Sequence, residues 1–177
     1  MAWRISILAA ALVLAAARAD AQFVLVTDCT KLSLRLQGIP EAAGVRCNGD
    51  DDQRNETIDA SGAGSTFVIR HQGSLRGYYL IREEVTGLVR KMAASGDAQD
   101  IGEPFEIANF DVVRYRGLDK RTKKPAPCFH FLRYSGHVAR TTGYRHAIIG
   151  FYCSDRDTEA SETRIAELLG AIDADFW

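Results

Sequence analysis

The chain has 177 residues, of which 46% are hydrophobic and 25% are charged. This composition is ordinary for a globular domain and excludes a wholly disordered chain. The formal net charge of −1 gives no overall attraction to polyanions, so we expect no nucleic-acid partner.

The first 21 residues have the pattern of a secretory signal peptide. Arg4 supplies a positive end, residues 5–17 are almost entirely apolar, and small residues occupy alternate positions from Ala17 to Ala21. A transmembrane helix needs about 20 apolar residues, so this run is too short to span a bilayer comfortably. We expect residues 22–177 to form one periplasmic or secreted domain with no transmembrane segment.

Four cysteines in an exported chain indicate disulfide bonds. Three pairings are possible, but the cysteines fall into two sequence-local couples. We therefore favour Cys29 with Cys47 and Cys128 with Cys153, each worth on the order of 3 kcal/mol through loop entropy. The absence of a C-x-x-C pair or of tight Cys/His spacing argues against zinc.

In the first half of the chain we expect strands at residues 23–26 and 31–36, where the second alternates leucine with polar residues. Glycine, proline and acidic residues interrupt every pattern over residues 37–65, which predicts a long loop. Residues 66–71 again have strand-like composition. Residues 75–94 repeat apolar side chains at spacings of three and four, which predicts a helix with one apolar face.

In the second half, an extended run is expected over residues 105–115, followed by two strands at residues 128–134 and 145–153. Placing Cys128 opposite Cys153 predicts an antiparallel register between these two strands. In that register His130 lies beside Phe151, Leu132 beside Ile149, Tyr134 beside Ala147, Phe129 beside Tyr152 and Arg133 beside Ile148. Both faces are largely apolar, so we expect this hairpin at the centre of a sheet.

A terminal helix is expected to run to about Ile172, with Asp155 or Asp157 as its cap. Its apolar face is predicted to consist of Ile165, Leu168, Leu169 and Ile172. The resulting order is strands, helix, three strands, helix. It predicts an α+β fold, a single domain in which two disulfides stabilise an antiparallel sheet packed by two helices.

An acidic segment between residues 48 and 59 partly matches the calcium-loop pattern. Its oxygen-bearing residues fall at the spacing of a twelve-residue cation loop, but Gln53 replaces the required glycine and no helix is evident on either side. The five matching positions are Asn48, Asp50, Asp52, Glu56 and Asp59. A solvated acidic loop is the favoured interpretation, and calcium binding stays open.

The histidines and hydroxyl residues form no recognisable catalytic motif. His130 is expected to be buried and neutral with one hydrogen-bond partner, whereas His137 lies in the hairpin loop and His146 on the opposite strand face. There is no G-x-S-x-G motif, and paired cysteines cannot act as thiolates. We therefore expect no catalytic residue, metal or cofactor, with a hydrolase that uses His137 or His146 as the alternative.

A basic run is the most distinctive local feature. Six cations occur within eleven residues and could attract an acidic protein or an anionic envelope component, although a solubilising loop is the favoured interpretation. These residues are Arg114, Arg116, Lys120, Arg121, Lys123 and Lys124. From the sequence we expect a non-catalytic binding or interaction protein, with a structural envelope component that docks through this run as a further alternative.

Overall fold

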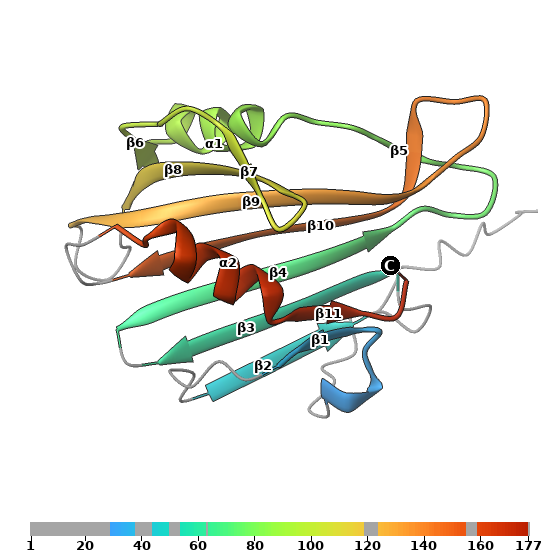
Figure 1. Cartoon of the computed structure of the whole chain (residues 1–177), viewed down its shortest axis with the longest axis horizontal. Helices are drawn as coiled ribbons and strands as arrows, with labels where there is room; N and C mark the ends of the chain where they lie inside the picture. Colours follow the sequence, from blue (N-terminus) through green and yellow to red (C-terminus); the bar gives the residue numbers. More distant parts are fainter. Residues whose placement is uncertain are drawn as a thin grey trace, which may run out of the picture.

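A computed structural model describes residues 29–37, 44–49, 54–62, 64–118, 124–154 and 159–176. Strands account for 55% of these residues and helices for 17%, so the protein is mostly β. The predicted α+β class is therefore wrong. A large sheet dominates the fold, and the two α-helices in the described part of the chain are short (Figure 1).

Nine strands of the described chain form the main antiparallel sheet. They are β2 (Gly44–Gly49), β3 (Asn55–Gly62), β4 (Ser65–Gly73), β5 (Leu80–Ile81), β6 (Ala98–Gln99), β7 (Phe105–Ile107), β8 (Phe110–Leu118), β9 (Pro125–His137) and β10 (Gly143–Ser154). The order across the sheet is β2-β3-β4-β10-β9-β8-β6, with β5 paired to β10 and β7 to β8.

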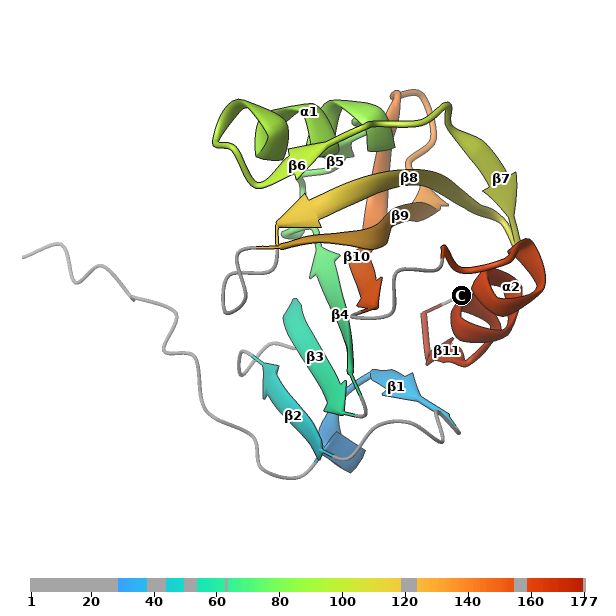
Figure 2. The ribbon, with the colours of Figure 1, turned by 90° about the vertical axis from the view of Figure 1, so that its left-hand side faces the viewer.

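The remaining elements cover this sheet. A 3-10 turn, η1 (Cys29–Lys31), leads into β1 (Leu34–Leu36), which pairs with β11 (Ile172–Ala174) as a separate two-stranded ribbon. The helices are α1 (Val85–Ala94) and α2 (Glu162–Gly170). Figure 2 shows a curved sheet, with α2, β1 and β11 on the inner side of the curve and α1 on the outer side.

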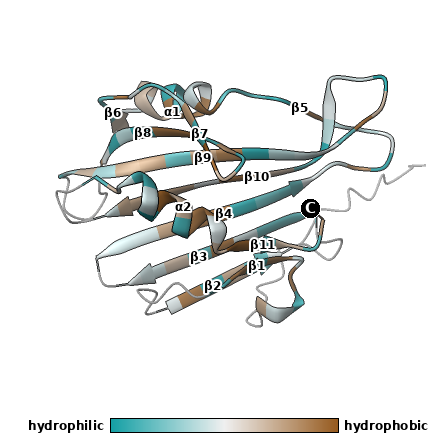
Figure 3. Cartoon of the chain, viewed as in Figure 1, coloured by the Kyte–Doolittle hydropathy of each residue, from teal (hydrophilic) through white to brown (hydrophobic). Residues whose placement is uncertain are grey.

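Alternation along the strands gives each face of the sheet its own core. On the inner face, aromatic rings of β4, β9 and β10 meet one another and the apolar side of α2. Its largest members are Phe67, Phe110, Phe129, Phe131, Ile165, Leu168 and Leu169. The outer core under α1 is smaller and consists of Val85, Val89, Ala98, Val113, Tyr115, Cys128 and Leu132. Both helices alternate hydrophobic and hydrophilic residues along their length, as expected for helices with one buried face (Figure 3).

The β9–β10 hairpin has the predicted register. Cys128 lies opposite Cys153, His130 opposite Phe151 and Leu132 opposite Ile149. Both strands are longer than predicted, and they occupy the centre of the sheet between β8 and β4. Both faces of β9 and β10 are covered, which explains why their sequences are almost continuously apolar.

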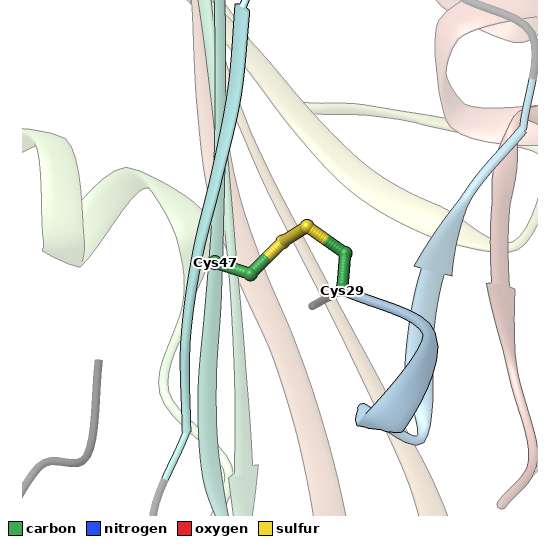
Figure 4. The surroundings of a disulfide bond; sticks show 2 residues. All are labelled: Cys29 and Cys47. Atoms are coloured by element: carbon green, nitrogen blue, oxygen red, sulfur yellow. A yellow bond between two sulfur atoms is a disulfide. The ribbon is translucent and has the colours of Figure 1, made fainter. Parts of the chain in front are cut away.

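Both disulfides favoured from the sequence are present. Cys128 bonds to Cys153 within the hairpin, and Cys29 bonds to Cys47, which ties η1 to β2 (Figure 4). Two disulfides indicate that the protein matures in an oxidising compartment. No helix in the described ranges is long and apolar enough to cross a bilayer. The predicted signal segment and the predicted strand at 23–26 lie outside the described residues.

Two segments differ from the sequence prediction. Residues 37–65 hold β2 and β3 rather than one long loop. The sequence hides β3 because its buried positions are Glu56, Ile58 and Ala60, and only Ile58 is large and apolar. Helix α1 begins only at Val85, because the chain before it pairs as β5 with β10 and turns at Gly77, where φ is 86°.

Smaller corrections concern the element ends. The run over residues 105–115 is two strands joined by a tight turn, in which Ala108 and Asn109 take φ values of 51° and 63°. Helix α2 is capped by the Ser161 hydroxyl, which accepts a hydrogen bond from the Arg164 N–H at 3.2 Å. The predicted caps, Asp155 and Asp157, lie outside the described residues.

Candidate functional site

A carboxylate is buried at one end of the inner face. Glu56 of β3 is fully buried and accepts hydrogen bonds from the Ser33 N–H at 2.9 Å, the Ser33 hydroxyl at 2.8 Å and the Leu34 N–H at 3.0 Å. These donors belong to β1 and the residue before it. Glu56 therefore fastens the β1–β11 ribbon to the main sheet.

Two imidazoles extend this group toward the surface. Glu56 Oε2 lies 3.3 Å from Nδ1 of His71, and His71 Nε2 lies 3.1 Å from Nδ1 of His146. The Nδ1–H of His71 is poorly aligned with the carboxylate, so we treat this contact as electrostatic. Phe176 stacks on His71 with 3.9 Å between ring centroids and on His146 with 4.7 Å.

The carboxylate assigns the tautomers of both rings. A proton on Nδ1 of His71 faces Glu56, so Nε2 of His71 accepts a hydrogen bond from Nδ1 of His146. This arrangement leaves Nε2 of His146 as a lone pair on a partly exposed side chain. It is a carboxylate–imidazole–imidazole chain that ends in a potential base.

The environment shifts two pKa values in this group. Burial alone would raise the pKa of Glu56, but the contact with His71 and the hydrogen bonds from Ser33 and Leu34 outweigh burial and hold the pKa below its ordinary value. Burial, together with the electrostatic influence of His71 and Arg145, lowers the pKa of His146. The favoured state of the cluster therefore has an ionised Glu56 at one end and a neutral His146 at the other, with His71 between them. Among the described residues, no group of three or more His, Cys, Asp or Glu side chains could hold a metal ion.

The described part of the basic run is engaged in the fold. The Arg114 guanidinium lies 4.7 Å from the centroid of the Phe105 ring and donates to the Ala160 carbonyl at 3.4 Å, just before α2. Arg116 shares this face of β8, and Lys124 directly precedes β9. The other three predicted binding residues, Lys120, Arg121 and Lys123, lie outside the described residues.

The calcium interpretation finds no support in its described positions. Glu56 and Asp59 point to opposite faces of β3, and their carboxylates bind different partners. Asp59 pairs with Arg46 at 3.0 Å. The two sheet carboxylates are therefore not ligands of one cation. Asn48 lies in β2 opposite Thr57, and Asp50 and Asp52 lie outside the described residues.

The other two histidines named from the sequence lie apart from the cluster. His130 is buried on the outer face as expected, but neither ring nitrogen has a hydrogen-bond partner, and burial lowers its pKa to about 4. His137 is exposed at the end of β9, edge-on to Tyr144.

Large apolar side chains are exposed at the end of the sheet where β9 turns into β10. We call Leu75, Tyr78, Tyr79 and Ile81 the apolar end patch; their exposed fractions are 51%, 68%, 46% and 72%. Only Ile81 of the patch belongs to β5, in which Leu80 lies opposite Tyr144 and Ile81 opposite Gly143 of β10; the other three members precede this strand. The ring of Tyr79 fills the space that a side chain at position 143 would need, so Gly143 is required for this packing. Figure 1 shows the hairpin and this segment forming one end of the molecule.

Three arginines lie in the segment of the apolar end patch or in the hairpin that it pairs with. Arg145 donates from Nη1 to the Tyr78 carbonyl at 3.1 Å, and Arg140 lies in the turn of the hairpin. Arg76 lies within the segment itself. None of the three has a carboxylate partner among the described residues, whereas Arg82 nearby pairs with Asp111 at 2.9 Å.

Comparison with known proteins gave no matching family model, no similar curated protein and no similar solved structure. No function is therefore transferred from a relative, and the site has to be judged from its geometry.

Sequence reasoning missed both the Glu56 cluster and the apolar end patch. The sequence predicts a solvated loop around Glu56, because Asn55, Glu56 and Thr57 are all polar and give no sign of a buried strand position. It predicts a helix over the apolar end patch, in which Leu75, Tyr78 and Ile81 would face a core. The spacing of apolar residues alone could not separate these two outcomes.

Proposed function

We propose that this chain is a non-catalytic binding domain, exported to the periplasm or the cell exterior, that contacts its partner through the apolar end patch. The observation that carries the proposal is the exposure of four large apolar side chains in one short segment. Tyrosine and arginine are enriched at binding surfaces, and contiguous exposed apolar side chains mark interaction sites more often than isolated ones do.

The Glu56 cluster supports this choice indirectly. Its carboxylate is saturated by backbone and side-chain donors of β1, and Phe176 covers both imidazoles. These contacts hold the ribbon in place, which is a structural role. Arg114 is likewise occupied by Phe105, so we do not place the contact surface on the basic run.

Site-specific photo-crosslinking tests the proposal. A benzophenone amino acid at Tyr78 or Ile81, introduced separately and expressed in the export host, should give the same adduct from both positions. Matched positions are Val45 and Leu118, which are exposed apolar side chains in β2 and β8, and these should give none. Equal adducts from all four positions, or none from the apolar end patch, would contradict the proposal.

A hydrolase that uses His146 is the second candidate, favoured by the lone pair on its Nε2 at the end of the carboxylate–imidazole chain. In this case the purified protein should turn over ester, amide or glycoside substrates. His146→Ala should abolish the turnover while His137→Ala leaves it intact. No turnover across such substrates rejects this candidate and leaves the binding proposal standing.

A further inference from the structure

We infer that the apolar end patch binds the surface of a lipid bilayer that contains anionic phospholipid. This inference rests on the proposed function and names the class of partner. Three features carry it: the size of the patch, its flanking charges and the chemistry of its side chains.

The four apolar side chains by themselves present less area than a stable protein–protein interface buries. A large side chain exposes about 200 Å² when free, so at the observed fractions the four residues present on the order of 450 Å². A typical specific interface buries about 800 Å² on each partner. Insertion into the boundary between headgroups and acyl chains needs only a few apolar side chains, and flanking cations strengthen it.

The charges around the patch favour an anionic surface. Arg76, Arg140 and Arg145 lie within or beside the patch without carboxylate partners in the described chain. Glu83 and Glu84 follow on the α1 side, and Glu83 is neutralised by Lys91 at 2.7 Å. The whole chain carries a formal net charge of −1, so the attraction is local to this end. Each basic side chain near such a membrane adds to binding over about a Debye length.

Arg140 adds a conformational argument. Its φ is 65°, in the left-handed region where glycine or asparagine is ordinarily found. An arginine held there at a turn places its charge at the extreme end of the hairpin.

The side chains themselves suit an interface between water and lipid. Tyr78 and Tyr79 combine an apolar ring with a hydroxyl, the combination enriched at the headgroup level of bilayers. Leu75 and Ile81 supply purely apolar surface beside them. An acidic protein would pair with the arginines equally well, but its interface would need about 350 Å² beyond the roughly 450 Å² of the patch.

Vesicle flotation tests the inference with the protein purified after export, because an uncleaved apolar run at residues 5–17 would bind vesicles by itself. The protein should float with vesicles of phosphatidylcholine and phosphatidylglycerol but not with phosphatidylcholine alone, and added salt should weaken the binding. Tyr78→Ser with Ile81→Ser should reduce binding at least tenfold, and Arg76→Gln with Arg140→Gln should remove the preference for the anionic vesicles. Matched controls are Val45→Ser with Leu118→Ser and, on α1, Arg90→Gln, which should bind like the wild type.

Three outcomes would overturn the inference: no flotation with anionic vesicles, equal flotation of the patch variants, or a dimer in sedimentation that Ile81→Ser dissociates. Failure here is separable from failure of the proposed function. If the crosslinks at Tyr78 and Ile81 contain a protein and no lipid, the binding proposal survives and the membrane is the wrong partner.

Discussion

At the scale of single residues, His130 shows how the burial of a titratable group makes the stability of the fold depend on pH. Its ring lies on the outer face beside Phe151, and neither nitrogen has a partner. Burial lowers its pKa from an ordinary 6.5 to about 4, because the charged form would lose its hydration. Below about pH 6.5 the unfolded chain therefore binds a proton that the folded chain refuses, and stability falls as the pH drops toward 4.

Replacing this ring with an apolar side chain of similar volume should remove that penalty. We expect His130→Leu to raise the free energy of unfolding by about 2 kcal/mol near pH 5, and by less at pH 8, because only the buried unsatisfied nitrogens matter there. Urea unfolding across this pH range measures the effect.

The exposed His137 provides the control, since His137→Leu should leave the pH dependence of stability unchanged. Parallel stability profiles for wild type and His130→Leu would show that His130 is not the group responsible. Glu56 and His146 act in the same direction on acidification. Both have lowered pKa values in the fold, so each contributes stability that is lost as the pH falls through its folded-state pKa.

At the scale of elements, the two helices differ at their first turns. The Ser161 hydroxyl caps α2, whereas Glu84 at the start of α1 makes no capping hydrogen bond through its side chain. Ser161→Ala should therefore lower the free energy of unfolding by about 1 kcal/mol, and Glu84→Ala should change it by less than about 0.5 kcal/mol.

Chemical denaturation of the two variants provides the comparison, and Glu84→Ser offers a converse test. A serine at that position could accept from the free N–H groups of the first turn and should stabilise α1. Equal losses for Ser161→Ala and Glu84→Ala would mean that the capping contact at α2 contributes nothing to stability.

Elements with one dominant local signal were predictable from the sequence. The β9–β10 register followed from a single cross-strand disulfide, because one fixed pair sets every other pair. The buried face of α2, with Ile165, Leu168 and Leu169, also followed from its spacing. The pairing of β2 with β3 did not, because Glu56 occupies a core position that only its distant donors, Ser33 and Leu34, make tolerable.

The fold class failed for a related reason. Residues 75–84 have helical spacing of apolar side chains, yet β10 offers them a strand partner and the apolar side chains remain exposed. The pairing of β5 with β10 therefore prevailed over the helical spacing of the apolar residues in this segment. The candidate site could not be predicted because both of its parts arise from long-range contacts: His71 meets His146 across 75 positions of sequence.

At the scale of the whole molecule, the sheet is covered on opposite faces by elements held in different ways. Helix α1 is sequence-local to the strands it covers, whereas the β1–β11 ribbon joins the two ends of the described chain. Cys29–Cys47 and the bonds from Glu56 both hold the segment around β1 against β2 and β3. We therefore expect the contributions of the Cys29–Cys47 disulfide and of the Glu56 hydrogen bonds to stability to be coupled.

A double-mutant cycle tests the coupling. Replacing Cys29 and Cys47 with serine should cost on the order of 3 kcal/mol, and Glu56→Gln about the same, because it leaves buried donors without their carboxylate. Once one fastening is cut the segment is already loose, so the combined loss should fall short of the sum by about 1 kcal/mol.

The hairpin disulfide gives the matched control, because Cys128 and Cys153 bond within β9–β10 rather than to the β1 segment. Serine at both of these positions should add to Glu56→Gln within about 0.5 kcal/mol. All proteins should be unfolded in the same sucrose-containing buffer, since an excluded osmolyte keeps the weakest variant folded. Equal additivity for the two disulfides would mean that the ribbon is not released as a unit. A shortfall confined to Cys29–Cys47 would identify it as a separately opening part of the fold, held from two sides at η1 and at Glu56.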